Sequence, residues 1–176
     1  VKQSTFPLIH RILFTQMFRL GSPANYTPSP DESISAMAQN LGVTPQEMAY
    51  DILIENQGRG FIYAPLVNYA NYTMEACAEM LDDPYSIMGL GDGGAHVGFI
   101  LDAGYPTWLI SYWNQTLQRY SVEETVRRLT SDTANAAGLR DRGRIAVGLK
   151  ADFNIIDWSS VRAGDPYLIA DLPAGG

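Results

Sequence analysis

The sequence predicts an α/β fold in which strands alternate with helices, as in a parallel sheet or a barrel. Three features support this prediction: repeated helix-start signals of the form Ser/Thr-x-x-Glu, short apolar runs bounded by turn residues, and the alternation of the two along the chain. With 46% apolar and 18% charged residues, the 176-residue chain can bury a core. Its apolar runs are too short for a transmembrane helix, so no membrane partner is expected.

The first third of the sequence is predicted to be helical. Residues 4–19 carry apolar side chains at helical spacing, and His10 on the flank of that stripe is interpreted as an ordinary helix residue. Ser29–Glu32 and Thr44–Glu47 each combine an N-cap residue, a proline at the first helical position and a glutamate at the third. These two signals predict helices that end near Gln39 and Asn56.

Two short buried strands flank the next helix. Residues 61–64 and 86–90 are short apolar runs between turn signals, which is typical of strands buried in a sheet. Between them, Thr73 is expected to cap a helix over 74–81. Cys77 on this helix has apolar neighbours and is predicted to be a core residue.

The region that follows is again helical. Residues 106–119 show helical spacing, and their aromatic stripe is predicted to pack in the core. Ser121–Glu124 is a further capping box and starts a helix that ends at Leu129. The stripe consists of Trp108, Leu109, Tyr112, Trp113, Thr116 and Leu117.

The last part of the chain changes character. A short helix over 131–137 is followed by two tightly joined strands, 144–147 and 151–157. Because the strands of the α/β region are too few to close a barrel, we expect the chain to be a fragment of a longer protein. The absence of an initiator Met before Val1 and the turn signal at 172–176 favour the same expectation.

The net charge and the cysteine count limit which partners and which cellular compartment are expected for the chain. The net charge is −7 and most basic residues are scattered, so a nucleic-acid partner is not expected. The single cysteine cannot form an internal disulfide, which suits a reducing compartment. Without a recognisable signal peptide, the predicted location is cytoplasmic.

A glycine-rich run, MGLGDGGAHVG at 88–98, is the stretch most suggestive of a site. Gly89–Gly94 matches the dinucleotide fingerprint Gly-x-Gly-x-x-Gly, but Asp92 would repel a pyrophosphate there and no acid follows at the required distance. Asp92 could instead be a metal ligand at the end of a barrel strand, with other ligands supplied from elsewhere. The third interpretation is a simple Asp-Gly turn without chemistry.

Two blocks of sequence resemble one enzyme family. Gly89–His96 (GLGDGGAH) is similar to the strand-eight motif of the amidohydrolase superfamily, in its D-aminoacylase or N-acyl-D-amino-acid deacylase branch. Leu129–Asp157 resembles that branch's closing signature, and Tyr26–Leu81 is similar less specifically. The resemblance implies the C-terminal part of a metallo-dependent hydrolase (β/α)8 TIM barrel. Residues 1–140 would form the last β/α units, and 141–176 would return into a small β-sandwich.

The resemblance also implies a metal-dependent chemistry. Asp92 would bind zinc, as one or two ions whose other ligands lie outside this chain, and would shuttle a proton. A metal-bound hydroxide would attack the amide carbonyl, while Asp92 would take the proton of the water and hand it to the leaving amine. His96 and Gly93 are weaker candidates for substrate binding.

The implied substrate is a small molecule with a linear amide, most simply an N-acyl-D-amino acid. Residues 98–112 contain no Arg or Lys, in contrast to well-studied D-aminoacylases, which also favours an apolar substrate pocket near Phe99, Tyr105 and Trp108. Two alternatives stay open: an amidohydrolase for a cyclic amide or carbamoyl compound, and a non-catalytic module derived from a barrel. The remainder of the parent chain is the expected partner, and the fragment alone is expected to be inactive and to self-associate or be poorly ordered.

Overall fold

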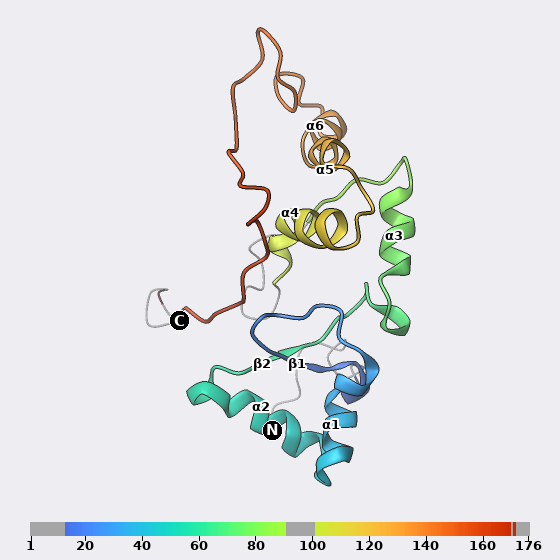
Figure 1. The fold of residues 1–176 in the computed structure, drawn as a ribbon, viewed down its shortest axis with the longest axis vertical. Helices are drawn as coiled ribbons and strands as arrows, with labels where there is room; N and C mark the ends of the chain where they lie inside the picture. The colour runs from blue at the N-terminus through green and yellow to red at the C-terminus, as the bar shows by residue number, and fades with distance from the viewer. Residues whose placement is uncertain (1–12, 91–100, 170, 172–176) are drawn as a thin grey trace. The chain divides into compact units, whose positions relative to one another are not determined.

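The computed structural model describes residues 13–90, 101–169 and 171. The chain divides into two compact units, Val1–Glu79 with Asp165–Gly176, and Met80–Gly164. Figure 1 shows the helices and strands of both units. Within the described ranges, no helix has the length and apolar character that crossing a bilayer requires.

The first unit follows the predicted helix-start signals closely. Glu32 and Glu47 each bond back to the backbone N–H of their capping residue, Ser29 and Thr44, at 2.8 Å, which confirms both capping boxes. The first box opens a 3-10 turn, and Ser33 then caps the α-helix itself. In chain order the elements are η2 (Phe14–Gln16), β1 (Phe18–Leu20), η3 (Pro30–Glu32), α1 (Ile34–Leu41), α2 (Pro45–Gly58), β2 (Phe61–Tyr63), η4 (Ala70–Tyr72) and the start of α3 (Glu75–Asp82).

A two-stranded antiparallel sheet replaces the end of the helix predicted over residues 4–19. β1 pairs with β2, with Phe18 opposite Tyr63 and Leu20 opposite Phe61. Phe18 and Leu20 are buried and Arg19 between them is exposed, which is the period of a strand rather than of a helix. The strand predicted at 61–64 forms over 61–63, but its residues are half-buried rather than buried.

The core of the first unit lies between α1 and α2. Ile34 and Ala38 on α1 meet Met48 and Ile52 on α2, and Ile52 is completely buried. Cys77, predicted to be a core residue, is only half-buried, and its thiol donates a hydrogen bond to the Asn68 carbonyl (3.2 Å). Partly buried side chains surround the cluster: Phe14, Met17, Met37, Ala49 and Ile62.

The second unit is helical in its described part. Leu109 and Trp113 are buried, but Leu117 at the end of the predicted aromatic stripe is exposed. The Ser121 side chain accepts a hydrogen bond from the Glu124 N–H (3.1 Å), which confirms the predicted start of the next helix. The unit contains the end of α3, then η5 (Asp102–Gly104), α4 (Tyr105–Trp108), the π-helix η6 (Leu109–Thr116), α5 (Val122–Leu129) and α6 (Ser131–Ala136).

Three strands predicted from apolar runs are not formed. Residues 86–90, 144–147 and 151–157 contain no strand, and the sheet of the described residues is the antiparallel pair β1–β2. A strand needs a neighbour that satisfies its backbone hydrogen bonds, and none lies beside these segments in the described structure. Val147 and Ile155 are accordingly fully exposed. The described residues thus do not confirm the predicted barrel.

Candidate functional site

The residues singled out from the sequence fall in a part of the chain that the structure does not describe. Asp92, Gly93 and His96 lie within 91–100, and His10 lies within 1–12, all outside the described residues. The described segments that precede and follow Asp92 in the sequence both belong to the second unit.

The segment before Asp92 begins with a hydrogen-bonded turn. α3 ends at Asp82, and Asp83 then accepts a hydrogen bond on its carboxylate from the Tyr85 N–H (2.7 Å). The Asp83 carbonyl also accepts a bond from the Ser86 N–H (3.1 Å). An Asp side chain that bonds the backbone two residues on is a local turn former. The path of the chain is thus fixed locally from Asp82 to Ser86.

The segment after Asp92 leads into the π-helix. The rings of Trp108 and Tyr112 stack at 4.4 Å between centroids, with their planes 10° apart. Asn114 in η6 is buried and bridges two segments: its amide donates to the Tyr120 carbonyl (2.7 Å) and its carbonyl accepts from the Trp158 indole (3.0 Å). π-Helices often accompany functional sites, and this one is held by a satisfied buried amide.

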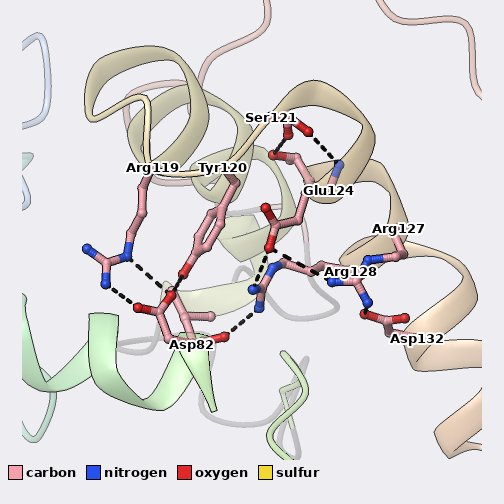
Figure 2. Close-up of polar contacts among 10 residues, drawn as sticks. Asp82, Arg119, Tyr120, Ser121, Glu124, Arg127, Arg128 and Asp132 are labelled. Carbon is pink, nitrogen blue, oxygen red and sulfur yellow. Dashed lines mark hydrogen bonds and ion pairs between the residues drawn. The ribbon is translucent and has the colours of Figure 1, made fainter. Parts of the chain in front are cut away.

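Asp82 is the centre of a polar network (Figure 2). Its carboxylate accepts hydrogen bonds from the Tyr120 hydroxyl (2.8 Å) and from Arg119 Nε (3.3 Å), and it forms an ion pair with Arg119 Nη2. Arg119 and Tyr120 lie in the loop between η6 and α5. We call the following residues the Asp82 network: Asp82, Arg119, Tyr120, Glu124 and Arg128.

Arg128 connects this network to the end of α3 by a second route. Its guanidinium donates to the Leu81 carbonyl and to the Glu124 carboxylate (2.9 Å), and it lies 4.2 Å from the centre of the Tyr120 ring. Its side chain is 15% exposed, the lowest value for an arginine in the ion pairs of the described residues. A cation at the C-terminal end of a helix also interacts favourably with the helix dipole. Two arginines therefore hold the end of α3.

The contacts within the network shift the pKa values of its members. Hydrogen bonds from Arg119 and then from Tyr120 lower the pKa of the Asp82 carboxyl. Burial, and then the hydrogen bond to Asp82, raise the pKa of the Tyr120 hydroxyl. At neutral pH the Asp82 carboxyl is thus charged and the Tyr120 phenol is neutral, which suits a structural anchor.

The described residues do not form a metal site. No three His, Cys, Asp or Glu side chains in the described ranges lie close enough together to hold an ion. The Asp82 carboxylate is occupied by Arg119 and Tyr120. Asp92, the one metal ligand expected within this sequence, lies outside the described residues.

A hollow in the first unit was not predicted from the sequence. It encloses about 840 Å³ between β1, the loop that follows it, the end of α2 and residues 165–166. Arg19 and Glu55 in its lining form an ion pair at 2.8 Å, and Asp165 accepts a hydrogen bond from the Ala24 N–H (2.7 Å). Because the lining residues come from segments far apart in the chain, no local motif marks this surface.

The Asp82 network was not predicted from the sequence either. Asp82 and Arg119 are 37 residues apart, and neither belongs to a motif. The available signal was indirect: the acidic end of one predicted helix, and an Arg-Tyr pair directly before the capping box of another. Such signals do not reveal which acidic side chain pairs with which arginine.

Comparison with known proteins identifies the class of the chain. The family model described as the amidohydrolase family matches residues 19–172, which supports a hydrolase. Because the match covers most of the sequence, the chain belongs to the amidohydrolase family. No curated protein and no solved structure matches the chain.

Proposed function

We propose that this chain is part of a metal-dependent hydrolase that cleaves a linear amide, most simply an N-acyl-D-amino acid. The observation that carries the proposal is the amidohydrolase family match over 19–172, which spans both Asp92 and the closing signature at 129–157. The deacylase substrate is supported by the resemblance of Gly89–His96 and of that signature to the D-aminoacylase branch.

Asp92 is the proposed catalytic residue. Its carboxylate accepts a proton from the attacking water as the new C–O bond forms, and then donates that proton to the nitrogen as the C–N bond breaks. One group can serve as base and then as acid because the proton travels from water to nitrogen within one site. His96 and Gly93 are proposed to contact the substrate.

A bound metal ion is proposed because of the chemistry that is usual in the family. Amidohydrolases usually bind metal ions, which would supply Lewis-acid assistance to the attack of water on the amide. Asp92 is proposed to supply one oxygen ligand, and the resemblance to the family implies that the other ligands come from sequence outside these 176 residues. Zinc is the proposed ion.

The substrate is proposed to carry an apolar or aromatic group. Residues 98–112 contain no Arg or Lys, and Trp108 is half-buried in a stack with Tyr112. Flat aromatic surfaces of this kind favour apolar groups over a free carboxylate. We therefore expect N-acyl substrates with aromatic or branched side chains to be preferred.

The test combines a substitution at Asp92 with a substrate panel. In the polypeptide that carries this chain together with the remaining ligands, Asp92→Asn should lower kcat by roughly 10² to 10⁴-fold. Asp102→Asn, at an exposed aspartate that follows in sequence, is the matched control and should leave kcat unchanged. The panel consists of N-acetyl-D-leucine, N-acetyl-L-leucine, a hydantoin and an N-carbamoyl amino acid, with metal content measured by mass spectrometry.

The activity of the Asp92→Asn variant and of the protein on the panel distinguishes the alternatives. Full activity and metal content in Asp92→Asn would overturn the proposed role of Asp92. Hydrolysis of only the hydantoin or the carbamoyl compound would replace the linear-amide substrate with the cyclic or carbamoyl class. A protein that hydrolyses none of the four would favour a non-catalytic module.

A further inference from the structure

Residues 151–156 of the second unit have no backbone partner in the part of the chain that the structure describes. None of their N–H or carbonyl groups forms a hydrogen bond with another described residue. Figure 1 draws this orange part of the chain without a helix or a strand. Backbone groups left open in this way bond water or a strand supplied from elsewhere.

The 151–156 segment is held at both of its ends. Before it, the Lys150 N–H donates a hydrogen bond to the Asp141 carbonyl (2.8 Å). After it, the Trp158 indole donates to the Asn114 side chain (3.0 Å), and the Trp158 carbonyl accepts a bond from the Gln115 amide. Because both ends are tied to the same unit, the residues between them lose less freedom when they pair with a strand.

The side chains of this segment carry an exposed apolar face. Phe153 is 63% exposed and Ile155 is fully exposed. Since successive residues of a strand point to opposite faces, these two would share one face and Asn154 would lie on the other. An open backbone edge beside exposed apolar side chains is a template for pairing with another strand.

The sequence of the segment is complementary to itself in antiparallel pairing. If a two-fold axis passes at Asn154, Phe153 of each copy lies opposite Ile155 of the other copy. An aromatic side chain opposite a β-branched one is a favourable cross-strand pair, and the axis creates it twice. Asp152 then lies opposite Ile156, so no like charges face each other.

The neighbouring symmetric registers are less favourable. With the axis at Ile155, Phe153 would lie opposite Asp157, whose carboxylate accepts hydrogen bonds from Ser159. With the axis at Phe153, the pair would extend to Lys150, whose N–H is already bonded within its own chain. The axis at Asn154 therefore fits the segment best.

We propose that residues 151–156 are a self-docking strand, through which two copies of this chain form a two-fold symmetric antiparallel pair. The inference concerns a different segment from the proposed active site and does not depend on the hydrolase function. So short a ribbon buries less surface than a standard interface, so we expect a weak dimer with a Kd of roughly 10 μM to 1 mM.

Disulfide cross-linking tests the register. All variants carry Cys77→Ser, so that the introduced thiol is the only one in the chain. In the proposed pair, Asn154→Cys lies opposite itself with the two Cα atoms about 4.5 to 5.5 Å apart, which a disulfide can span. The matched control is Ala151→Cys, at another exposed position of the segment, where the two copies would be about 20 Å apart.

The oxidation rates distinguish the arrangements of the two copies. We expect Asn154→Cys to form a disulfide-linked dimer at least tenfold faster than Ala151→Cys. Equal rates would overturn the antiparallel register, because parallel in-register strands bring both positions together and non-specific contacts favour neither.

The strength of association is measured by sedimentation of the 176-residue chain up to about 1 mM. Ile155→Glu should raise the Kd at least tenfold, because it places a carboxylate opposite Phe153. Val147→Glu, at a fully exposed apolar residue outside the segment, is the control and should leave the Kd unchanged. Phe153→Glu combined with Ile155→Lys sets opposite charges across the pair and should recover part of the loss.

Three results would overturn the proposal. The first is a chain that stays monomeric throughout this range and forms no disulfide in Asn154→Cys. The second is association that Val147→Glu weakens as much as Ile155→Glu. The third is a longer polypeptide containing this chain that is monomeric and has slowly exchanging amides at 151–156, since that segment would then be covered within one molecule. Circular dichroism of each variant verifies that these substitutions at exposed positions leave the helices intact.

Discussion

The Tyr120 hydroxyl donates a 2.8 Å hydrogen bond to the Asp82 carboxylate and so joins the loop before α5 to the C-terminal end of α3. This one bond acts on both groups, since it favours the charged carboxylate and the protonated phenol. The Arg119 hydrogen bond and then this bond lower the pKa of Asp82, whereas burial and then this bond raise the pKa of Tyr120. The two shifts predict opposite pH dependences.

At acid pH, we expect Asp82 to lose its contribution to the free energy of unfolding. Its pKa in the folded chain lies below the ordinary value of 3.8, so the contribution is complete above that value and is lost as the pH falls through the folded pKa. The measurement is urea unfolding of wild type and Asp82→Asn between pH 7 and pH 2. The difference between the two proteins should shrink below pH 4, and a difference that stays constant would contradict the prediction.

At alkaline pH, we expect Tyr120 to lose its contribution to the free energy of unfolding. Its pKa in the folded chain lies above the ordinary value of 10.0, mainly because the ring is buried, so its contribution is complete below pH 10 and is lost as the pH rises through the folded pKa. Spectrophotometric titration should show a late-ionising phenol that is missing from Tyr120→Phe. Tyr26 also has a raised pKa, so Tyr26→Phe must be titrated in parallel to assign the signal.

The core of the first unit offers a matched pair of isoleucines on α2. Ile52 is completely buried between α1 and α2, whereas Ile54 on the same helix is 50% exposed. Ile52→Ala should lower the free energy of unfolding by roughly 2 to 5 kcal/mol, because it leaves a cavity among Ile34 and Met48. Ile54→Ala should cost less than about 1 kcal/mol. Equal losses in denaturant unfolding would show that α1 and α2 do not pack in this way.

Local signals in the sequence predicted the helices well. The capping box at Thr44 and the N-cap at Ser121 act through residues three positions away, so a short window contains all the information needed. The strand over 18–20 was mistaken for a helix because the apolar residues before it continue a helical spacing, and only pairing with β2 decides the outcome. Propensity alone cannot show which segment finds a partner.

Tertiary contacts account for what the sequence could not predict. Asp82 and Tyr120 form a network that depends on how α3 and the loop before α5 pack, and this packing has no local sequence signature. Conversely, Val147 and Ile155 have the apolar pattern of a strand, yet they are fully exposed in the described structure because no strand lies beside them. The candidate Asp92 came from a motif alone, and its role stays a prediction.

Gly60, directly before β2, gives the sharpest test of the backbone packing in the first unit. A Cβ atom at this position would lie 1.8 Å from the carbonyl oxygen of Ile52 and 2.9 Å from its carbonyl carbon, and backbone atoms of a helix cannot move aside as a flexible side chain can. Gly60→Ala should therefore lower the free energy of unfolding by roughly 3 kcal/mol, the upper part of the range for overpacked sites. Gly21 has no atom within 4 Å of the same ideal Cβ position, so Gly21→Ala is the control and should change stability by less than about 1 kcal/mol. Unfolding in urea, followed by circular dichroism, measures both. A Gly60→Ala protein as stable as Gly21→Ala would show that Gly60 does not approach the backbone of Ile52 on α2 so closely.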